Sequence, residues 1–319
     1  MKRCLVTGIS GFIGHHLANR LASEVDEVVG VDINRPIYNL NGAVKFWKAD
    51  LCDRDKAIAL FQDFGPFDEV YHLAAAMGGM GYIETSACEI MHDSTLINVN
   101  VLDAAAKSGV KKFFFSSSAC VYRNMDSVEN LSEDDAYPAQ CPNEYGWQKL
   151  FTERMILAYA QKYGFQPRIA RFGNTFGPQG TWDGGREKAP AAMCRKIAML
   201  PPEGGEIEVW GDGTALRSYQ YIDDLLDGIQ ALMESDLATP VNLGTEEYIT
   251  VDELAYMVAR VANKRITIKH VPGCVGVASR QCKIDLARTA IGWKPTFLTA
   301  EGLRITYPWI SEQVEKHNK

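Results

Sequence analysis

The stretch "VTGISGFIGHHL", residues 6–17, places Gly8, Gly11 and Gly14 at three-residue spacing between an apolar run and an amphipathic segment. Glycine permits the tight turn that such a connection needs, and it lets backbone N–H groups come close to an anion. The N-terminus of the helix that follows also attracts negative charge. The stretch therefore predicts a strand, a phosphate-binding turn and a helix, which together open a dinucleotide-binding fold.

The second predicted strand, "EVVGVD" at residues 27–32, ends on Asp32, 18 residues after Gly14. A carboxylate at this place accepts hydrogen bonds from a ribose diol and repels a 2′-phosphate, so the sequence favours NAD over NADP. Further predicted cofactor contacts lie in the glycine stretch or at the end of the third strand: Phe12, Ile13, Asp50 and Leu51.

Short apolar runs alternate with helical patterns through the first half of the chain, which predicts βαβ units. With 319 residues, 46% hydrophobic and 23% charged, the chain is long enough to bury a large core. The expected fold class is α/β, a Rossmann-like doubly wound parallel sheet with a smaller C-terminal α/β substrate domain. The expected NAD-binding domain covers residues 1–171 and about 219–244, and the nucleotide-sugar-binding domain covers about 172–218 and 245–319.

The segments "NTFGPQGTWDGGREKAPAA" (174–192) and "PPEGGEIEVWGDG" (201–213) are rich in glycine and proline. Such punctuation predicts loops carried on a scaffold rather than another layer of sheet. Helices are expected from about residue 223 to 233, 251 to 261 and 301 to 315.

Net charge is -7 and no run of like charge stands out, which disfavours a nucleic-acid or membrane partner. No segment has the length and apolarity of a membrane span, and the start "MKRCLVTGIS" has no apolar stretch typical of a signal peptide. The eight cysteines include no C-x-x-C pair, and the six histidines form no pattern typical of a metal site. We expect a cytoplasmic protein with thiol cysteines and no metal.

The segment "EYGWQKL", residues 144–150, places Tyr145 and Lys149 four residues apart, on one face of a predicted helix. A phenol with a pKa of about 10 is a poor base at neutral pH unless a nearby ammonium stabilises the phenolate. Lys149 is expected to do this and to hold the nicotinamide ribose. Ser118, at the end of the apolar strand "FFFSSS" (113–118), joins them as the third candidate catalytic residue.

These segments, with "HLAA" at 72–75 and "RFGNTFGP" at 171–178, make the chain resemble the extended short-chain dehydrogenases/reductases of the NAD-dependent epimerase/dehydratase family. The resemblance covers essentially all of the chain. It implies that Ser118, Tyr145 and Lys149 oxidise a sugar hydroxyl with NAD, and it implies a homodimer.

Other segments, including "AAAMGGMGYI" (74–83) and "GTWDGGREKAPAAMCRK" (180–196), resemble those members of the family that epimerise a GDP-sugar at C3 and C5. A substrate of this class is implied by the resemblance alone. The resemblance also implies a set of substrate-binding residues: Met77, Gly78, Asn174, Glu187, Lys188, Lys196, Arg217 and Arg280.

Cys120 and Lys188 are the candidate acid/base pair. A ketone at C4 acidifies the hydrogens on C3 and C5, and inverting a carbon needs proton removal on one face of the ring and delivery on the other. Cys120 lies two residues after Ser118, and its thiolate is a competent base if a cation lowers its pKa. The resemblance places Lys188 on the opposite face. By itself, a cysteine here is usually a small buried hydrophobe and a lysine a solvated charge.

Two other interpretations stay open. The chain is alternatively another NAD-dependent nucleotide-sugar 4-epimerase or 4,6-dehydratase of the same fold. A non-catalytic NAD-binding regulatory protein is the remaining class, because fold does not fix function.

Overall fold

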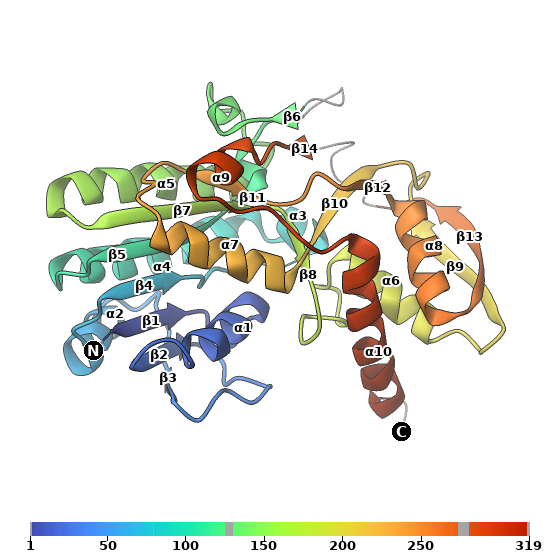
Figure 1. The fold of residues 1–319 in the computed structure, drawn as a ribbon, viewed down its shortest axis with the longest axis horizontal. Coiled ribbons are helices and arrows are strands. Elements are labelled where there is room, and N and C mark those ends of the chain that lie inside the picture. Colours follow the sequence, from blue (N-terminus) through green and yellow to red (C-terminus); the bar gives the residue numbers. More distant parts are fainter. Residues whose placement is uncertain (1, 79, 125–129, 274–280, 318–319) are drawn as a thin grey trace.

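A computed structural model of the chain describes residues 2–78, 80–124, 130–273 and 281–317. Its largest sheet has seven parallel strands in the order β11-β7-β5-β4-β1-β2-β3 (Figure 1). The order reverses between β1 and β4, which creates the switch point where such sheets bind ligands. The prediction of a doubly wound parallel sheet is confirmed. The strands are β1 (Arg3–Thr7), β2 (Glu27–Asp32), β3 (Val44–Lys48), β4 (Glu69–His72), β5 (Lys112–Ser118), β7 (Gln166–Phe172) and β11 (Val241–Leu243).

Side chains alternate between the two faces of this sheet, and each face has its own buried cluster. In β1, Cys4 and Val6 pack toward one face, whereas Leu5 packs toward the other. The first face is covered by α1 (Phe12–Leu21) and α7 (Ile222–Glu234). The second is covered by α2 (Arg54–Phe64), α4 (Ala87–Lys107) and α5 (Glu144–Tyr163). Both faces are apolar, which explains why the strands read as continuous hydrophobic runs.

Helix α5 begins and ends where its sequence indicates. The Asn143 side chain accepts a hydrogen bond from the Gly146 N–H at 3.0 Å, which caps the N-terminus. Gly164 ends the helix at φ 81°, a left-handed conformation that glycine adopts without steric cost. These two signals fix the register of the helix that carries Tyr145 and Lys149.

The C-terminal part builds small sheets of its own, so the prediction of loops over 174–192 and 201–213 is wrong for part of each segment. Strand β8 (Asn174–Phe176) lies between glycine turns, and β9 (Gly204–Trp210) alternates Ile207 and Val209 with exposed glutamates. Gly204 is required by pairing, since a Cβ there would lie 1.7 Å from the Arg265 carbonyl oxygen. The glycines that indicated loops are thus partly devices for close strand pairing.

The small sheets are β12-β10-β8, β13-β9 and β14-β6. Figure 1 shows α6, α8 and α10 grouped with β9 and β13 at one end of the molecule. No helix in the described ranges combines the length and apolarity needed to cross a membrane. The remaining elements are α3 (Met80–Thr85), η1 (Ala119–Val121), β6 (Asn130–Leu131), η2 (Glu133–Ala136), α6 (Ala189–Ala198), β10 (Leu216–Tyr221), β12 (Tyr248–Thr250), α8 (Val251–Ala262), β13 (Arg265–Val271), β14 (Gln281–Cys282), α9 (Asp285–Ala290) and α10 (Thr299–His317).

Candidate active site

The glycine turn between β1 and α1 cannot accommodate larger residues. Gly8 has φ +72°, and a Cβ on it would lie 2.8 Å from the Ala74 backbone nitrogen. A Cβ on Gly14 would lie 2.2 Å from the Gly8 carbonyl oxygen. The N-cap of α1 is Gly11, which has no side chain to bond the first N–H groups of the helix. Those groups are left for an anionic ligand, as a dinucleotide pyrophosphate requires.

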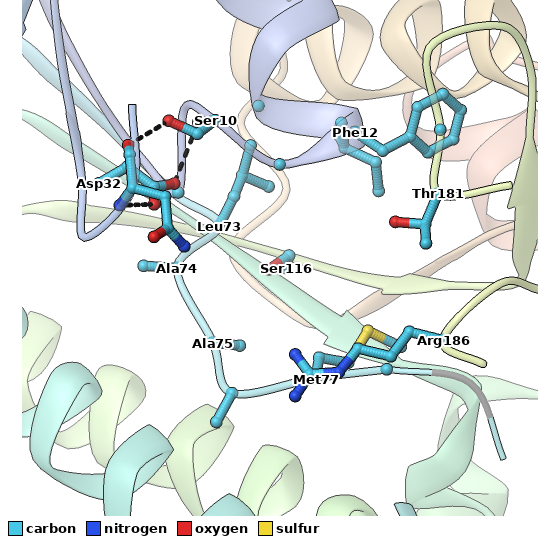
Figure 2. A pocket seen from close by; sticks show the side chains of 18 of the residues that line it. Ser10, Phe12, Asp32, Leu73, Ala74, Ala75, Met77, Ser116, Thr181 and Arg186 are labelled. Atoms are coloured by element: carbon cyan, nitrogen blue, oxygen red, sulfur yellow. Dashed lines mark hydrogen bonds between the residues drawn. The ribbon is translucent and has the colours of Figure 1, made fainter. Parts of the chain in front are cut away.

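Asp32 joins the end of β2 to this turn. Its carboxylate accepts a hydrogen bond from the Ser10 N–H at 3.0 Å (Figure 2). It accepts another from the Asn34 N–H at 2.9 Å. Burial raises the pKa of Asp32, and these backbone bonds act in the opposite direction. A carboxylate fixed in this way can still accept from a ribose hydroxyl, because each oxygen has more than one acceptor site.

A cavity of about 900 Å³ runs over the carboxyl ends of the strands. In Figure 2, Ser10 and Asp32 lie at one end of it, and Met77 and Arg186 lie at the other. Gly78, Ser118 and Lys188 also line it. The cavity brings together all the residues predicted to bind the cofactor: Gly8, Gly11, Phe12, Ile13, Gly14, Asp32, Asp50, Leu51, Tyr145 and Lys149.

Ser118, Tyr145 and Lys149 meet at the wall of this cavity, and all are buried. The Lys149 Nζ atom donates to the Ser116 carbonyl oxygen at 2.7 Å and lies 4.6 Å from the centroid of the Phe115 ring. The same Nζ atom is 5.7 Å from the Tyr145 ring centroid. These contacts place a cation beside the phenol, as the four-residue spacing predicts.

The pKa of Tyr145 reflects its burial. Burial raises the pKa above its ordinary value, and negative charge on Cys120 acts in the same direction. A hydrogen bond with the Ser118 side chain lowers it. Burial also lowers the pKa of Lys149 to about 7. Desolvation therefore disfavours the phenolate in the protein alone, and its stabilisation by Lys149 stays a prediction.

Cys120 lies in the 3₁₀ turn η1, two residues after Ser118. Its N–H donates to the Ser118 hydroxyl oxygen at 3.1 Å. Its side chain is partly buried and packs on the cluster that contains Tyr145. Among the described residues, the cavity lining includes Lys188 but not Cys120. Helix α5 approaches this turn so closely that a Cβ on Gly146 would lie 2.1 Å from the Cys120 carbonyl oxygen. Gly146 was not singled out from the sequence, although its place after Tyr145 is the available signal.

Lys188 is the N-cap residue of α6, and its side chain lines the cavity from the C-terminal part of the chain. Burial lowers the pKa of Lys188, and negative charge on Cys120 raises it. The two candidate acid/base groups are therefore close enough to interact electrostatically. A lowered lysine pKa increases the neutral amine, which is the form that accepts a proton.

The remaining predicted substrate residues lie outside the cavity lining in the described part of the chain. The Asn174 amide donates to the Ser218 carbonyl oxygen at 3.3 Å, and the Lys196 Nζ donates to that of Glu208 at 2.6 Å. Arg217 lies on β10 and donates to the Leu216 carbonyl oxygen at 2.8 Å. Glu187 accepts from Arg195 at 2.9 Å through one oxygen, while its buried Oε2 has no hydrogen-bond partner. Arg280 lies outside the described residues.

A buried ion pair supports the strands beneath the site. Arg171 Nη2 and Glu153 Oε2 are 2.7 Å apart, and each side chain is only 2% exposed. The Ser117 hydroxyl also donates to Glu153. Glu153 lies one helical turn after Lys149, so this pair joins α5 to β5 and β7 next to Ser118. We did not predict it, because two charges 18 residues apart give no local pattern.

Two cavity residues that the sequence interpretation also missed are Tyr82 and Arg186. The Arg186 guanidinium carbon lies 4.2 Å from the centroid of the Tyr82 ring. Arg186 lies in the same segment as Lys188, which was a usable signal, whereas nothing local marks Tyr82. No group of three or more His, Cys, Asp or Glu side chains in the described ranges could hold a metal ion.

The profile of the NAD dependent epimerase/dehydratase family matches residues 4–244, about three quarters of the chain. The chain belongs to this family. The family is NAD-dependent, and the site fits that cofactor because no side chain caps the start of α1, and the glycine turn and Asp32 line the same cavity. The extended short-chain dehydrogenase/reductase resemblance is thus confirmed.

Among its relatives, GDP-mannose 3,5-epimerase 1 of Oryza sativa subsp. indica is 40% identical over an aligned length of 319. The alignment covers 98% of this chain and 83% of the relative. A UDP-glucose 4-epimerase of Thermotoga maritima, solved with UDP-glucose, has a TM-score of 0.89 at 25% identity and covers 98% of this chain and 99% of its own. A UDP-glucose 4-epimerase of Thermus thermophilus in complex with NAD has a TM-score of 0.83 at 26% identity, with 97% and 98% covered.

Proposed function

We propose that the chain is an isomerase that converts GDP-D-mannose to GDP-L-galactose, with GDP-L-gulose as the product when only C5 is inverted. The observation that carries the proposal is the 40% identity to a GDP-mannose 3,5-epimerase over 98% of the chain. The arrangement of Tyr145, Cys120 and Lys188 supports it, since this chemistry needs one oxidising centre and two acid/base groups.

Oxidation begins at the C4 hydroxyl. NAD, when bound, would supply the hydride chemistry of the C4 oxidation and of the final reduction, and the predicted contacts, with Asp32 on the ribose, are the residues that would hold it. Ser118 orients the C4 hydroxyl, and the Tyr145 oxygen takes its proton. Lys149 stabilises the phenolate through its ammonium, which the Ser116 carbonyl holds at 2.7 Å. Because burial raises the pKa of Tyr145, this charge assistance is required for the step.

Epimerisation then uses the acidity that the C4 ketone creates at C3 and C5. One of Cys120 and Lys188 removes a ring proton, the electron pair passes into the enolate, and the other group delivers a proton to the opposite face. The position of Lys188 in the cavity lining, and of Cys120 against the cluster that contains Tyr145, supports this pairing. A neutral Lys188 amine suits the role of base, and its protonated form suits that of acid.

Substrate binding is proposed from the same resemblance. Met77 and Gly78 line the cavity at its proposed sugar end. Glu187 lies outside the described lining with a buried and unpartnered Oε2, and the resemblance proposes it as an acceptor for a sugar hydroxyl. Cations and an amide donor are proposed to bind the nucleotide diphosphate: Asn174, Lys196, Arg217 and Arg280.

The test is incubation of the protein with GDP-D-mannose in deuterated water. We expect deuterium at sugar C3 and C5, no net change in the oxidation state of NAD, and GDP-L-galactose as a product. Absence of deuterium from both carbons contradicts the proposal. A 4-epimerase predicts inversion at C4 without these exchanges, and a 4,6-dehydratase predicts loss of water.

Cys120→Ser separates the enzyme from a non-catalytic NAD-binding regulatory protein. For the epimerase, NAD and GDP-mannose still bind while proton exchange is lost at the carbon that depends on the thiolate. A binding protein has no turnover to lose, so an exchange rate equal to that of the wild type contradicts a catalytic Cys120.

We also propose a cytoplasmic homodimer and the division into an NAD-binding domain (1–171 and about 219–244) and a nucleotide-sugar-binding domain (about 172–218 and 245–319). Exposed apolar side chains on α4 and α5 support the dimer: Met91, Leu96, Trp147, Phe151 and Leu157. Phe151 has the largest exposed fraction among them, at 56%. Light scattering of Phe151→Glu should give a monomer, whereas Tyr256→Glu on α8 should leave the wild-type mass unchanged.

A further inference from the structure

Residues 181–188 form an irregular segment that borders the cavity through Thr181, Arg186 and Lys188, and we call it the strap. It contains no helix or strand and ends on Lys188. Gly184 and Gly185 have φ +89° and +80°, and no heavy atom lies within 4 Å of a Cβ built on either. The path of the strap is therefore fixed neither by strand pairing nor by close packing at these two glycines. Side chains must hold the strap in place.

On one side, the strap is attached to the C-terminal helices. Arg195 of α6 lies 3.4 Å from an Asp183 carboxylate oxygen and 2.9 Å from one of Glu187. The Trp182 ring packs edge to face on the His317 ring of α10, with centroids 6.2 Å apart. These contacts fix the strap relative to α6 and α10.

On the other side, Arg186 reaches the first half of the chain. Its guanidinium carbon lies 4.2 Å from the centroid of the Tyr82 ring, and both residues line the cavity. Figure 2 shows Arg186 beside Met77 at this end of the cavity. The distance is well within the range of a cation–π contact.

Tyr82 is itself fixed against the reactive groups. It packs on the cluster of Ile83, Ile90 and Tyr145, as does Cys120. A Cβ on Gly78 would lie 2.7 Å from the Tyr82 Cβ, so the loop before α3 closes tightly on this residue. A contact with the Tyr82 ring is therefore a contact with the part of the molecule that holds Cys120 and Tyr145.

We propose that Arg186 is a positioning residue, which by stacking on Tyr82 holds Lys188 opposite Cys120 across the sugar ring. This inference rests on the proposed function, because Lys188 needs a defined position only if it transfers a ring proton. At the ring carbon where Lys188 is the base, an N–H bond forms at Lys188 Nζ as the ring C–H bond breaks, the electron pair passes into the enolate, and Cys120 delivers a proton to the opposite face. An amine displaced by about 1 Å transfers the proton about 100-fold more slowly.

The test compares Arg186→Met and Tyr82→Leu with Lys188→Met, using GDP-D-mannose in deuterated water. Lys188→Met first identifies the ring carbon whose exchange depends on Lys188. Exchange at that carbon should fall by about 10- to 100-fold in Arg186→Met and Tyr82→Leu, while exchange at the other carbon and KM stay within about twofold of the wild type. Tyr82→Phe, which keeps the ring, and Arg186→Lys, which keeps the cation, should restore most of the loss.

Lys162→Met is the matched control, since it removes a cation 5.1 Å from the Tyr163 ring at the far end of α5. It should exchange like the wild type. A rise in KM alone would make Arg186 a substrate-binding cation and overturn the proposal. Equal loss at both carbons, or no loss, overturns it as well. If the wild type exchanges no deuterium, the proposed function itself fails. The outcomes that overturn the role of Arg186 are different, because they are seen only with a wild type that does exchange.

Discussion

The glycine turn at residues 8–14 and the strap approach the same cavity, yet different parts of the chain hold them. In the turn, Gly8 and Gly14 contact backbone atoms that cannot move independently, so a Cβ has no room. In the strap, Gly184 and Gly185 have open space around them, and side-chain contacts set the path. Backbone packing suits a site that always binds the same cofactor, because it fixes the shape of that site. Side-chain contacts suit the strap, because they can adjust the position of one reactive amine. Substitutions in the two regions should therefore damage different properties.

The largest effect is expected for Gly14→Ala. Its Cβ would lie 2.2 Å from the Gly8 carbonyl oxygen, a backbone atom that cannot rotate away, so α1 must shift away from β1. We expect the free energy of unfolding to fall by about 3 kcal/mol, as in an overpacked core, and NAD binding to be lost. Urea unfolding and NAD titration measure the two effects. Gly42→Ala is the control, because nothing lies within 4 Å of its Cβ.

The second effect concerns Gly146→Ala, where the Cβ would lie 2.1 Å from the Cys120 carbonyl oxygen. Either α5 or η1 must move, and we expect a loss of about 1–3 kcal/mol in the free energy of unfolding. Tyr145 would also move relative to Cys120, so deuterium exchange should fall more than NAD affinity does. Gln161→Ala on the exposed end of α5 should change neither. Wild-type exchange in Gly146→Ala would mean that the contact is not needed to align the two residues.

The difference between the regions also decides what the sequence could predict. The glycine turn and Asp32 follow from local spacing, because a strand, a turn and a helix are contiguous in the chain. The contact between Tyr82 and Arg186 joins segments about 100 residues apart, and no local pattern encodes it. Strand β8 has three residues, too few to show a period, and the two glycines at the start of β9 obscure the alternation of Ile207 and Val209. Lys188 was found through resemblance, since a lysine beside glycines is ordinarily a surface charge.

The third prediction concerns the pH dependence of stability through Lys149. Its pKa in the folded chain is lowered to about 7 from 10.5, so between these values the unfolded chain binds more protons than the folded one. Stability contributed at this site therefore rises with pH in that window, by up to about 1.4 kcal/mol per pH unit. Lys149→Met removes the titration, and the difference in unfolding free energy between mutant and wild type should change accordingly from pH 7 to 10. A difference that is constant with pH contradicts the shift.

The smallest effect on stability is expected for Gly185→Ala in the strap. At φ +80° an alanine costs about 1–2 kcal/mol, yet its Cβ meets no atom, so the strap can relax without disturbing either buried cluster. NAD affinity should equal that of the wild type, while exchange at the carbon that depends on Lys188 falls several-fold because the amine is displaced. Gly185→Asn is the matched variant, since asparagine tolerates the left-handed region, and it should recover most of the exchange. A loss of NAD affinity in Gly185→Ala as large as in Gly14→Ala would mean that the strap and the turn form one rigid unit, and the distinction between backbone and side-chain control would fail.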